Sequence, residues 1–83
     1  MKQSRRYWFT FLTPALVEAP VLWRMSRAFP DVAFDIRQAT VKDAHGIMAV
    51  MLSGELEQVH AAAQFVRDAG VIVEPIEKSV VEG

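Results

Sequence analysis

The chain has 83 residues, of which 52% are apolar and 23% are charged, and its formal net charge at pH 7 is −1. This composition suits one small globular domain and excludes an intrinsically disordered chain. The near-neutral charge gives no argument for a nucleic-acid partner, and the absence of cysteine excludes disulfides, thiolate metal sites and thiol nucleophiles. A cytoplasmic location is compatible with that absence and is the one we expect.

The N-terminal segment is basic, with Lys2, Arg5 and Arg6 close together. It has two interpretations, a solubilising end or a contact for an anionic partner. The apolar region of a signal peptide does not follow it, and no apolar run approaches the ~18 residues of a membrane span. We therefore expect no membrane insertion.

The first predicted element is a strand over residues 6–12, which are rich in aromatic and branched side chains. Alternation places apolar groups on both faces: Tyr7, Phe9 and Phe11 on one, and Trp8, Thr10 and Leu12 on the other. Residues 13–19 are expected to form a loop. A first helix is then predicted from Pro20 to about Ala28, because proline fits the first helical position. Its inner stripe comprises Val21, Leu22, Met25, Ala28 and Phe29.

The second and third strands are predicted to form a hairpin around a turn at residues 42–46. The second, residues 32–41, carries Val32, Phe34 and Ile36 on one face and Ala33, Asp35 and Arg37 on the other. The third, residues 47–53, ends at Gly54 and has no polar side chain before Ser53. Its register is uncertain by one residue, so the outward set is either Met48, Val50 and Leu52 or Ile47, Ala49 and Met51.

A second helix is predicted over residues 55–69, with an inner stripe of Leu56, Val59, Ala62, Ala63, Phe65 and Val66. Gly70 fits the left-handed cap that follows a helix. A fourth strand, residues 71–76, is placed at an edge of the sheet by Pro75. This order predicts an α+β ferredoxin-like βαββαβ sandwich, with two helices on one face of a four-stranded antiparallel sheet. One domain would span residues 6–77, with flexible ends at residues 1–5 and 78–83.

One face of such a sheet has no helix to cover it, yet the first and third strands are apolar on both faces. The resulting patch would measure a few hundred Å², near the upper limit for a soluble monomer. We therefore expect a homodimer that covers part of this face. A monomer that tolerates the patch, or a C-terminal tail that folds over it, is the alternative.

The search for a catalytic or metal site finds little. His45 and His60 are predicted on different elements, and Asp43 with His45 supplies too few metal ligands. Glu57, His60 and Gln64 share one stripe, which is typical of a solvated helix face. No phosphate-binding loop or RNA-binding signature is present. We expect no enzymatic activity, no metal, no cofactor and no nucleic-acid partner.

Three segments together resemble the NIL domain: "YWFTF", "EAPVLWRMSRAFPDVAFDIRQATV" and "GIMAVMLSGELEQVHAAAQFVRDAGVIVEPI". The resemblance covers about residues 6–77. It implies a ferredoxin-like, ACT-like module that pairs into dimers. Such domains form the C-terminal regulatory part of the ATPase subunit of bacterial methionine importers, where methionine binding inhibits transport. They also occur fused to ferredoxin-type clusters and as stand-alone proteins, and a stand-alone module is the expectation here.

The family takes its name from an Asn-Ile-Leu triplet on the second strand, and this sequence has Asp35-Ile36-Arg37 there. The resemblance implies that these three residues lie at the ligand site. Asp35 and Arg37 could hold the ammonium and carboxylate of an amino acid, or could pair with each other or with a dimer partner.

Two functional hypotheses follow. The first is a regulatory module, a homodimer that binds an amino-acid-like metabolite such as methionine and acts on an unknown protein partner. The alternative is a protein-interaction module with no small-molecule ligand.

Overall fold

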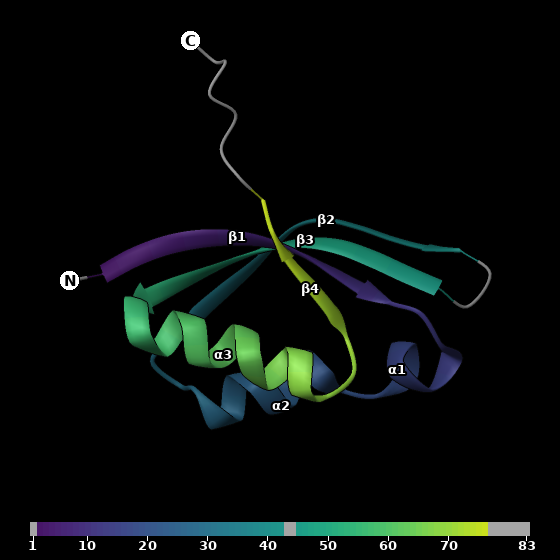
Figure 1. Cartoon of the computed structure of the whole chain (residues 1–83), viewed down its shortest axis with the longest axis horizontal. Helices are drawn as coiled ribbons and strands as arrows, with labels where there is room; N and C mark the ends of the chain where they lie inside the picture. The colour runs from purple at the N-terminus through teal and green to yellow at the C-terminus, as the bar shows by residue number, and fades with distance from the viewer. Residues whose placement is uncertain (1, 43–44, 77–83) are drawn as a thin grey trace, which may run out of the picture.

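The computed structural model describes residues 2–42 and 45–76, and these form a two-layer sandwich of one sheet and one layer of helices (Figure 1). In chain order the elements are β1 Lys2–Phe11, α1 Pro14–Glu18, α2 Val21–Ala28, β2 Ala33–Lys42, β3 His45–Glu55, α3 Leu56–Asp68 and β4 Ile72–Pro75. The strands are antiparallel in the order β2-β3-β1-β4, and the helices lie together below the sheet in Figure 1. The expected ferredoxin-like fold is confirmed, with one additional short helix.

The central strands are longer than predicted. β1 begins at Lys2 and pairs along its whole length with β3, which continues through Gly54 to Glu55. Residues 2–5, expected to form a flexible end, are therefore part of the sheet. Their polar sequence gives no hydrophobic alternation, but backbone pairing requires none, and the hydroxyls of Ser4 and Ser53 lie 2.8 Å apart across the strands.

Gly54 was expected to end β3 and does not. A Cβ placed on Gly54 would lie 3.2 Å from the carbonyl oxygen of Asp31 and 3.5 Å from Val32. Because glycine has no Cβ, it allows β3 to pack closely against the segment that leads into β2, and it does not break the strand.

The prediction of a loop over residues 13–19 is wrong, because α1 forms there. The hydroxyl of Thr13 accepts a hydrogen bond from the backbone N–H of Leu16 at 3.2 Å, and Pro14 occupies the start of the helix. Threonine followed by proline is a helix-start signal in its own right. The prediction gave weight only to Pro20, which caps α2.

The other helices and the outer strands agree with the prediction to within about one residue. Val21 and Met25 are buried on α2, and Val59, Ala62, Ala63 and Val66 are buried on α3. Gly70 has φ +104° at the end of α3, as its predicted left-handed cap requires. β4 lies at an edge of the sheet, as Pro75 indicated, and β2 forms the other edge.

The core lies between the sheet and the helices. Its largest fully buried side chains are Phe9, Met25, Val50, Leu52, Val59 and Val66. Phe34 and Ile36 of β2 lie directly opposite Leu52 and Val50, so they share the helix-covered face of the sheet. Because Val50 and Leu52 point into the core, the outward set on β3 is Ile47, Ala49 and Met51. Asp43 and Ala44 of the turn lie outside the described residues.

Candidate functional site

The sheet face opposite the helices carries a cluster of apolar side chains, which we call the open-face patch. Its members are Trp8 on β1, Ile47, Ala49 and Met51 on β3, and Ile72 on β4. Ile47 and Ile72 are 43% and 41% exposed, whereas Ala49 is only 7% exposed. The low value for Ala49 arises because the larger Trp8 and Gln38 flank it on the neighbouring strands. Within residues 2–42 and 45–76, no helix or strand covers this face (Figure 1).

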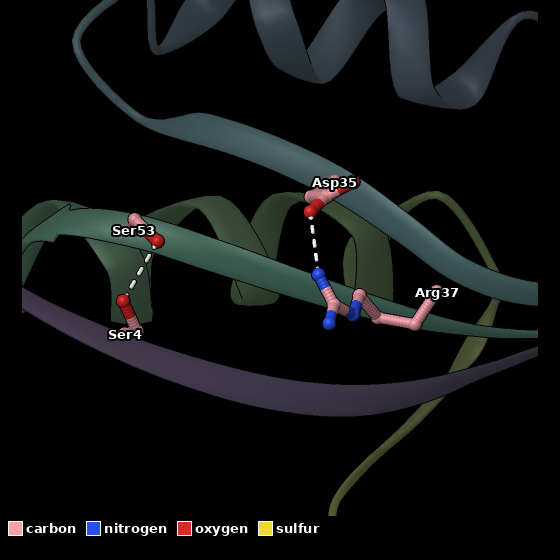
Figure 2. A network of polar contacts seen from close by, with 4 residues as sticks. All are labelled: Ser4, Asp35, Arg37 and Ser53. Carbon is pink, nitrogen blue, oxygen red and sulfur yellow. Dashed lines mark hydrogen bonds and ion pairs between the residues drawn. The ribbon is translucent and has the colours of Figure 1, made fainter.

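Beside the patch, Asp35 and Arg37 of β2 form an ion pair (Figure 2). Nη1 of Arg37 donates to Oδ2 of Asp35 at 2.8 Å, and both side chains are more than half exposed. Asp35 lies directly opposite Met51, so the pair adjoins the patch across the β2–β3 boundary. Exposed pairs of this kind contribute only about 0.2–1 kcal/mol, because water screens them. A competing ligand can therefore open this pair at small cost.

A β-bulge at Arg37 shapes this part of β2. Ile36 lies opposite Val50 and Gln38 lies opposite Ala49, so Arg37 is the extra residue between them. The bulge returns Gln38 to the open face immediately after Arg37, which concentrates polar groups beside Ala49. It also separates Arg37 from the regular hydrogen-bond ladder, and its side chain bends back toward Asp35.

The predicted triplet is thus divided between the two faces of the sheet. Asp35 and Arg37 meet on the open face, while Ile36, which is 46% exposed, lies on the helix-covered face opposite Val50. None of the three lines the cavity of about 710 Å³ or the cavity of about 200 Å³ that the described residues form. A ligand that binds here would contact the exposed Asp35–Arg37 pair and the apolar surface beside it. It would lie outside these cavities unless a partner covered it.

Among the remaining sequence candidates that the structure describes, the two histidines lie on separate elements. His45 begins β3, and Glu57, His60 and Gln64 are exposed on α3, as expected of a solvated helix face. Within the part of the chain that the structure describes, no group of three His, Cys, Asp or Glu residues could hold a metal ion. The same residues include no helix that is long and apolar enough to cross a membrane.

The sequence did not indicate the larger of these cavities, which measures about 710 Å³ and lies where β1 meets α3. Arg5 and Tyr7 of β1 and Arg67 of α3 are among its lining residues. The basic start of the chain was a partial signal for it. Nothing in the spacing of residues 5 and 67 indicates that they line the same cavity.

Comparison with known proteins identifies one family and several solved structures with a similar fold. The NIL domain family matches residues 11–75. The C-terminal domain of an ABC transporter ATP-binding protein from Enterococcus faecalis has a similar structure, with a TM-score of 0.73 and 18% sequence identity, over 90% of this chain and 86% of that one. The de novo designed protein Foldit4 is similar with a TM-score of 0.58 and 11% identity, over 95% of this chain and 100% of that one. No curated protein matches the sequence.

Proposed function

This chain belongs to the NIL domain family, and we propose that it is a regulatory module that binds an amino-acid-like metabolite and acts on a partner protein. The observation that carries the proposal is the adjacency of the Asp35–Arg37 pair and the open-face patch. A charged pair beside an apolar surface matches the two chemical parts of an amino acid with an apolar side chain. The fold shared with a C-terminal domain of an ABC transporter ATP-binding protein supports a role as a module that acts on another protein.

The ligand would replace each half of the ion pair with its own opposite charge. The carboxylate of Asp35 would accept hydrogen bonds from the ammonium, and the guanidinium of Arg37 would hold the carboxylate through two parallel hydrogen bonds. The side chain of the ligand would then lie over Met51, which faces Asp35 across the strand boundary. An apolar, unbranched side chain such as that of methionine fits this surface.

We further propose that two copies associate through the open-face patch. A patch of a few hundred Å² removed from water on each copy contributes roughly 25 cal/mol per Å², before the cost of association. Association would also shield the Asp35–Arg37 pair from water, which strengthens its hydrogen bonds to a ligand. Ligand binding and dimer formation would then favour each other.

A protein-interaction module without a metabolite is the second candidate. One observation favours it: Asp35 and Arg37 already satisfy each other, and neither lines a described cavity. On this alternative the open-face patch binds a protein partner. The Asp35–Arg37 pair then lies only at the edge of that protein–protein contact.

Thermal unfolding against a panel of amino acids, with L-methionine included, separates the two candidates. A ligand at about one hundred times its dissociation constant stabilises the fold by about 2.7 kcal/mol, which raises the midpoint by roughly 10–20 °C for a domain of this size. The metabolite hypothesis expects such a rise for one ligand, and expects Arg37→Ala to remove it. Arg24→Ala is the matched control, since Arg24 is exposed on α2, in the helix layer. A flat response across the panel would support the interaction module.

A further inference from the structure

The larger cavity results from unequal strand lengths at the edge of the sheet. β4 pairs only with residues 7–10 of β1, so the first half of β1 extends beyond it. The last backbone contact between the two segments is from the N–H of Ile76 to the carbonyl of Arg6, at 2.9 Å. α3 crosses this region on the helix side, and the space of about 710 Å³ lies between α3 and the extended part of β1. The cavity does not include the Asp35–Arg37 pair, which lies on the opposite edge strand, but it shares Met51 with the open-face patch.

The lining of this cavity is strongly basic. Arg5 and Arg6 contribute from β1 and Arg67 from α3, together with His60, and none of the described residues that line it is Asp or Glu. The whole chain carries a formal charge of −1, so this is a local concentration of positive charge on a near-neutral protein. A concave site lined by one sign of charge attracts ligands of the opposite sign.

The guanidinium groups are positioned by neutral acceptors. Arg67 donates to Oε1 of Gln64 at 3.1 Å and to the backbone carbonyl of Val73 at 3.0 Å. These two bonds fix its orientation at the part-buried wall of the cavity without neutralising its charge. Several of its five N–H donors remain available to a ligand.

Arg5 is held in a similar way. Its Nη1 donates to Oε1 of Gln3 at 3.2 Å and to the backbone carbonyl of Ser4 at 3.4 Å, both neutral groups. Among the described residues, neither Arg5 nor Arg67 forms an ion pair with a carboxylate. Two oriented and uncompensated guanidinium groups therefore line one cavity.

Tyr7 is a third hydrogen-bonding residue in the lining of this cavity. Its ring is buried, with 6% of its surface exposed, and it lines the same cavity. Burial raises the pKa of the Tyr7 hydroxyl, and the charges of Arg5 and Arg67 oppose that rise. Both guanidinium groups therefore lie close enough to the phenol to influence it, and the neutral hydroxyl is available to donate a hydrogen bond.

From this geometry we propose that the cavity binds the phosphate group of a small phosphate ester, with Arg5, Arg67 and Tyr7 as its donors. A phosphate dianion balances the charges of two guanidinium groups, whereas a single carboxylate balances only one of them. Guanidinium groups also match phosphate oxygens through pairs of parallel hydrogen bonds. The site goes beyond the proposed amino-acid function and would give the module a second, chemically different ligand.

The test is an NMR titration of the ¹⁵N-labelled protein with glycerol 3-phosphate, and with succinate as a carboxylate dianion. We expect glycerol 3-phosphate to shift the amides of residues 5–7 and 64–67 and to bind at least about tenfold more tightly than succinate. Arg5→Gln and Arg67→Gln should each weaken binding by about tenfold or more, since each removes a charge-assisted hydrogen-bond donor. Arg5→Gln is the safer variant, because Arg67 also holds the backbone carbonyl of Val73.

Two control variants make the outcome specific. Arg24→Gln removes the same charge from α2, away from the cavity, and Asp35→Ala alters the proposed amino-acid site; both should leave phosphate binding unchanged. If Arg24→Gln weakened glycerol 3-phosphate binding as much as the cavity variants do, the effect would come from the overall charge of the protein. That result would overturn the proposal. Equal affinity for succinate, shifts confined to residues 35–38, or no shift at all would also overturn it. Failure of phosphate binding with amino-acid binding intact would leave the proposed function standing.

Discussion

Arg37 donates a 2.8 Å hydrogen bond to Asp35 across one intervening residue, and that residue, Ile36, lies on the opposite face of the sheet. The pair is exposed, sits at a bulge in an edge strand and borders an apolar patch. Since an exposed pair contributes little to folding, a ligand or partner could open it without a large loss of stability.

The first prediction concerns the strength of this pair. In a double-mutant cycle of Asp35→Ala and Arg37→Ala, we expect a coupling free energy of about 0.2–1 kcal/mol that decreases as salt is added. Urea unfolding at one fixed protein concentration measures it. A coupling well above about 2 kcal/mol would show that the pair is structural and too costly for a ligand to open.

The second prediction concerns association through the open-face patch. Ile47→Glu places a charge in the patch and should convert the proposed dimer to a folded monomer, because burying an unpaired carboxylate is unfavourable. Sedimentation equilibrium at high micromolar concentration measures the mass. Val41→Glu is the matched control: Val41 is 62% exposed and lies on the other face of the sheet, opposite Gly46. A monomeric wild-type protein, or equal dissociation in both variants, would contradict dimer formation through this face.

The third prediction uses the single tyrosine of the chain. Burial raises the pKa of Tyr7 above its usual value of 10.0, with a smaller opposing effect from Arg5 and Arg67. As pH rises, the unfolded state therefore loses the phenol proton before the folded state does. The stability that the neutral phenol contributes is complete below pH 10 and is lost as pH rises through the pKa of the folded state. Absorbance at tyrosinate wavelengths should appear at higher pH in the folded protein than in urea. Coincident titrations would contradict a buried Tyr7, and Tyr7→Phe should remove the signal.

The fourth prediction concerns the end of α3. Gly70 has φ +104°, and a Cβ there would meet only ordinary contacts with Leu16, at 3.5 and 3.7 Å. The cost of Gly70→Ala is therefore set by the backbone, and we expect a loss of about 1–2 kcal/mol. Gly70→Asn should cost less, because asparagine tolerates the left-handed region better. Urea unfolding measures both, and a neutral Gly70→Ala would contradict the assigned conformation.

Sequence patterns predicted the elements that bury a regular apolar stripe. Tyr7, Phe9 and Phe11 occupy the core face of β1, and Val59 and Val66 occupy the core face of α3, as their spacing indicated. The positions of these residues could be predicted from the sequence, because in both strands and helices the spacing of apolar residues determines which of them share the buried face. The order of such elements then restricted the fold to one architecture.

The sequence was less informative wherever structure depends on pairing between distant segments. Residues 2–5 form a strand because β3 offers them a partner, although they carry no apolar pattern. The outward set Ile47, Ala49 and Met51 depended on a register that no local signal specified. The bulge at Arg37 was likewise unforeseen, because it is defined only by the partner residues Val50 and Ala49.

The candidate sites show the same contrast. Asp35 and Arg37 are two residues apart on one strand, so their shared face followed from alternation alone. Arg5 and Arg67 line one cavity only because α3 packs against β1, and the sequence separates them by most of the chain. Clusters built from distant elements require the fold before they can be seen.

The central claim is that an amino-acid-like ligand binds beside the Asp35–Arg37 pair. It is tested most directly by ¹⁵N chemical-shift mapping of the protein with a pool of amino acids that includes L-methionine. We expect saturable shifts at residues 35–38, 49 and 51, and their loss in Arg37→Ala but not in Arg24→Ala. An absence of shifts throughout the pool, or shifts located elsewhere on the sheet, would contradict the account.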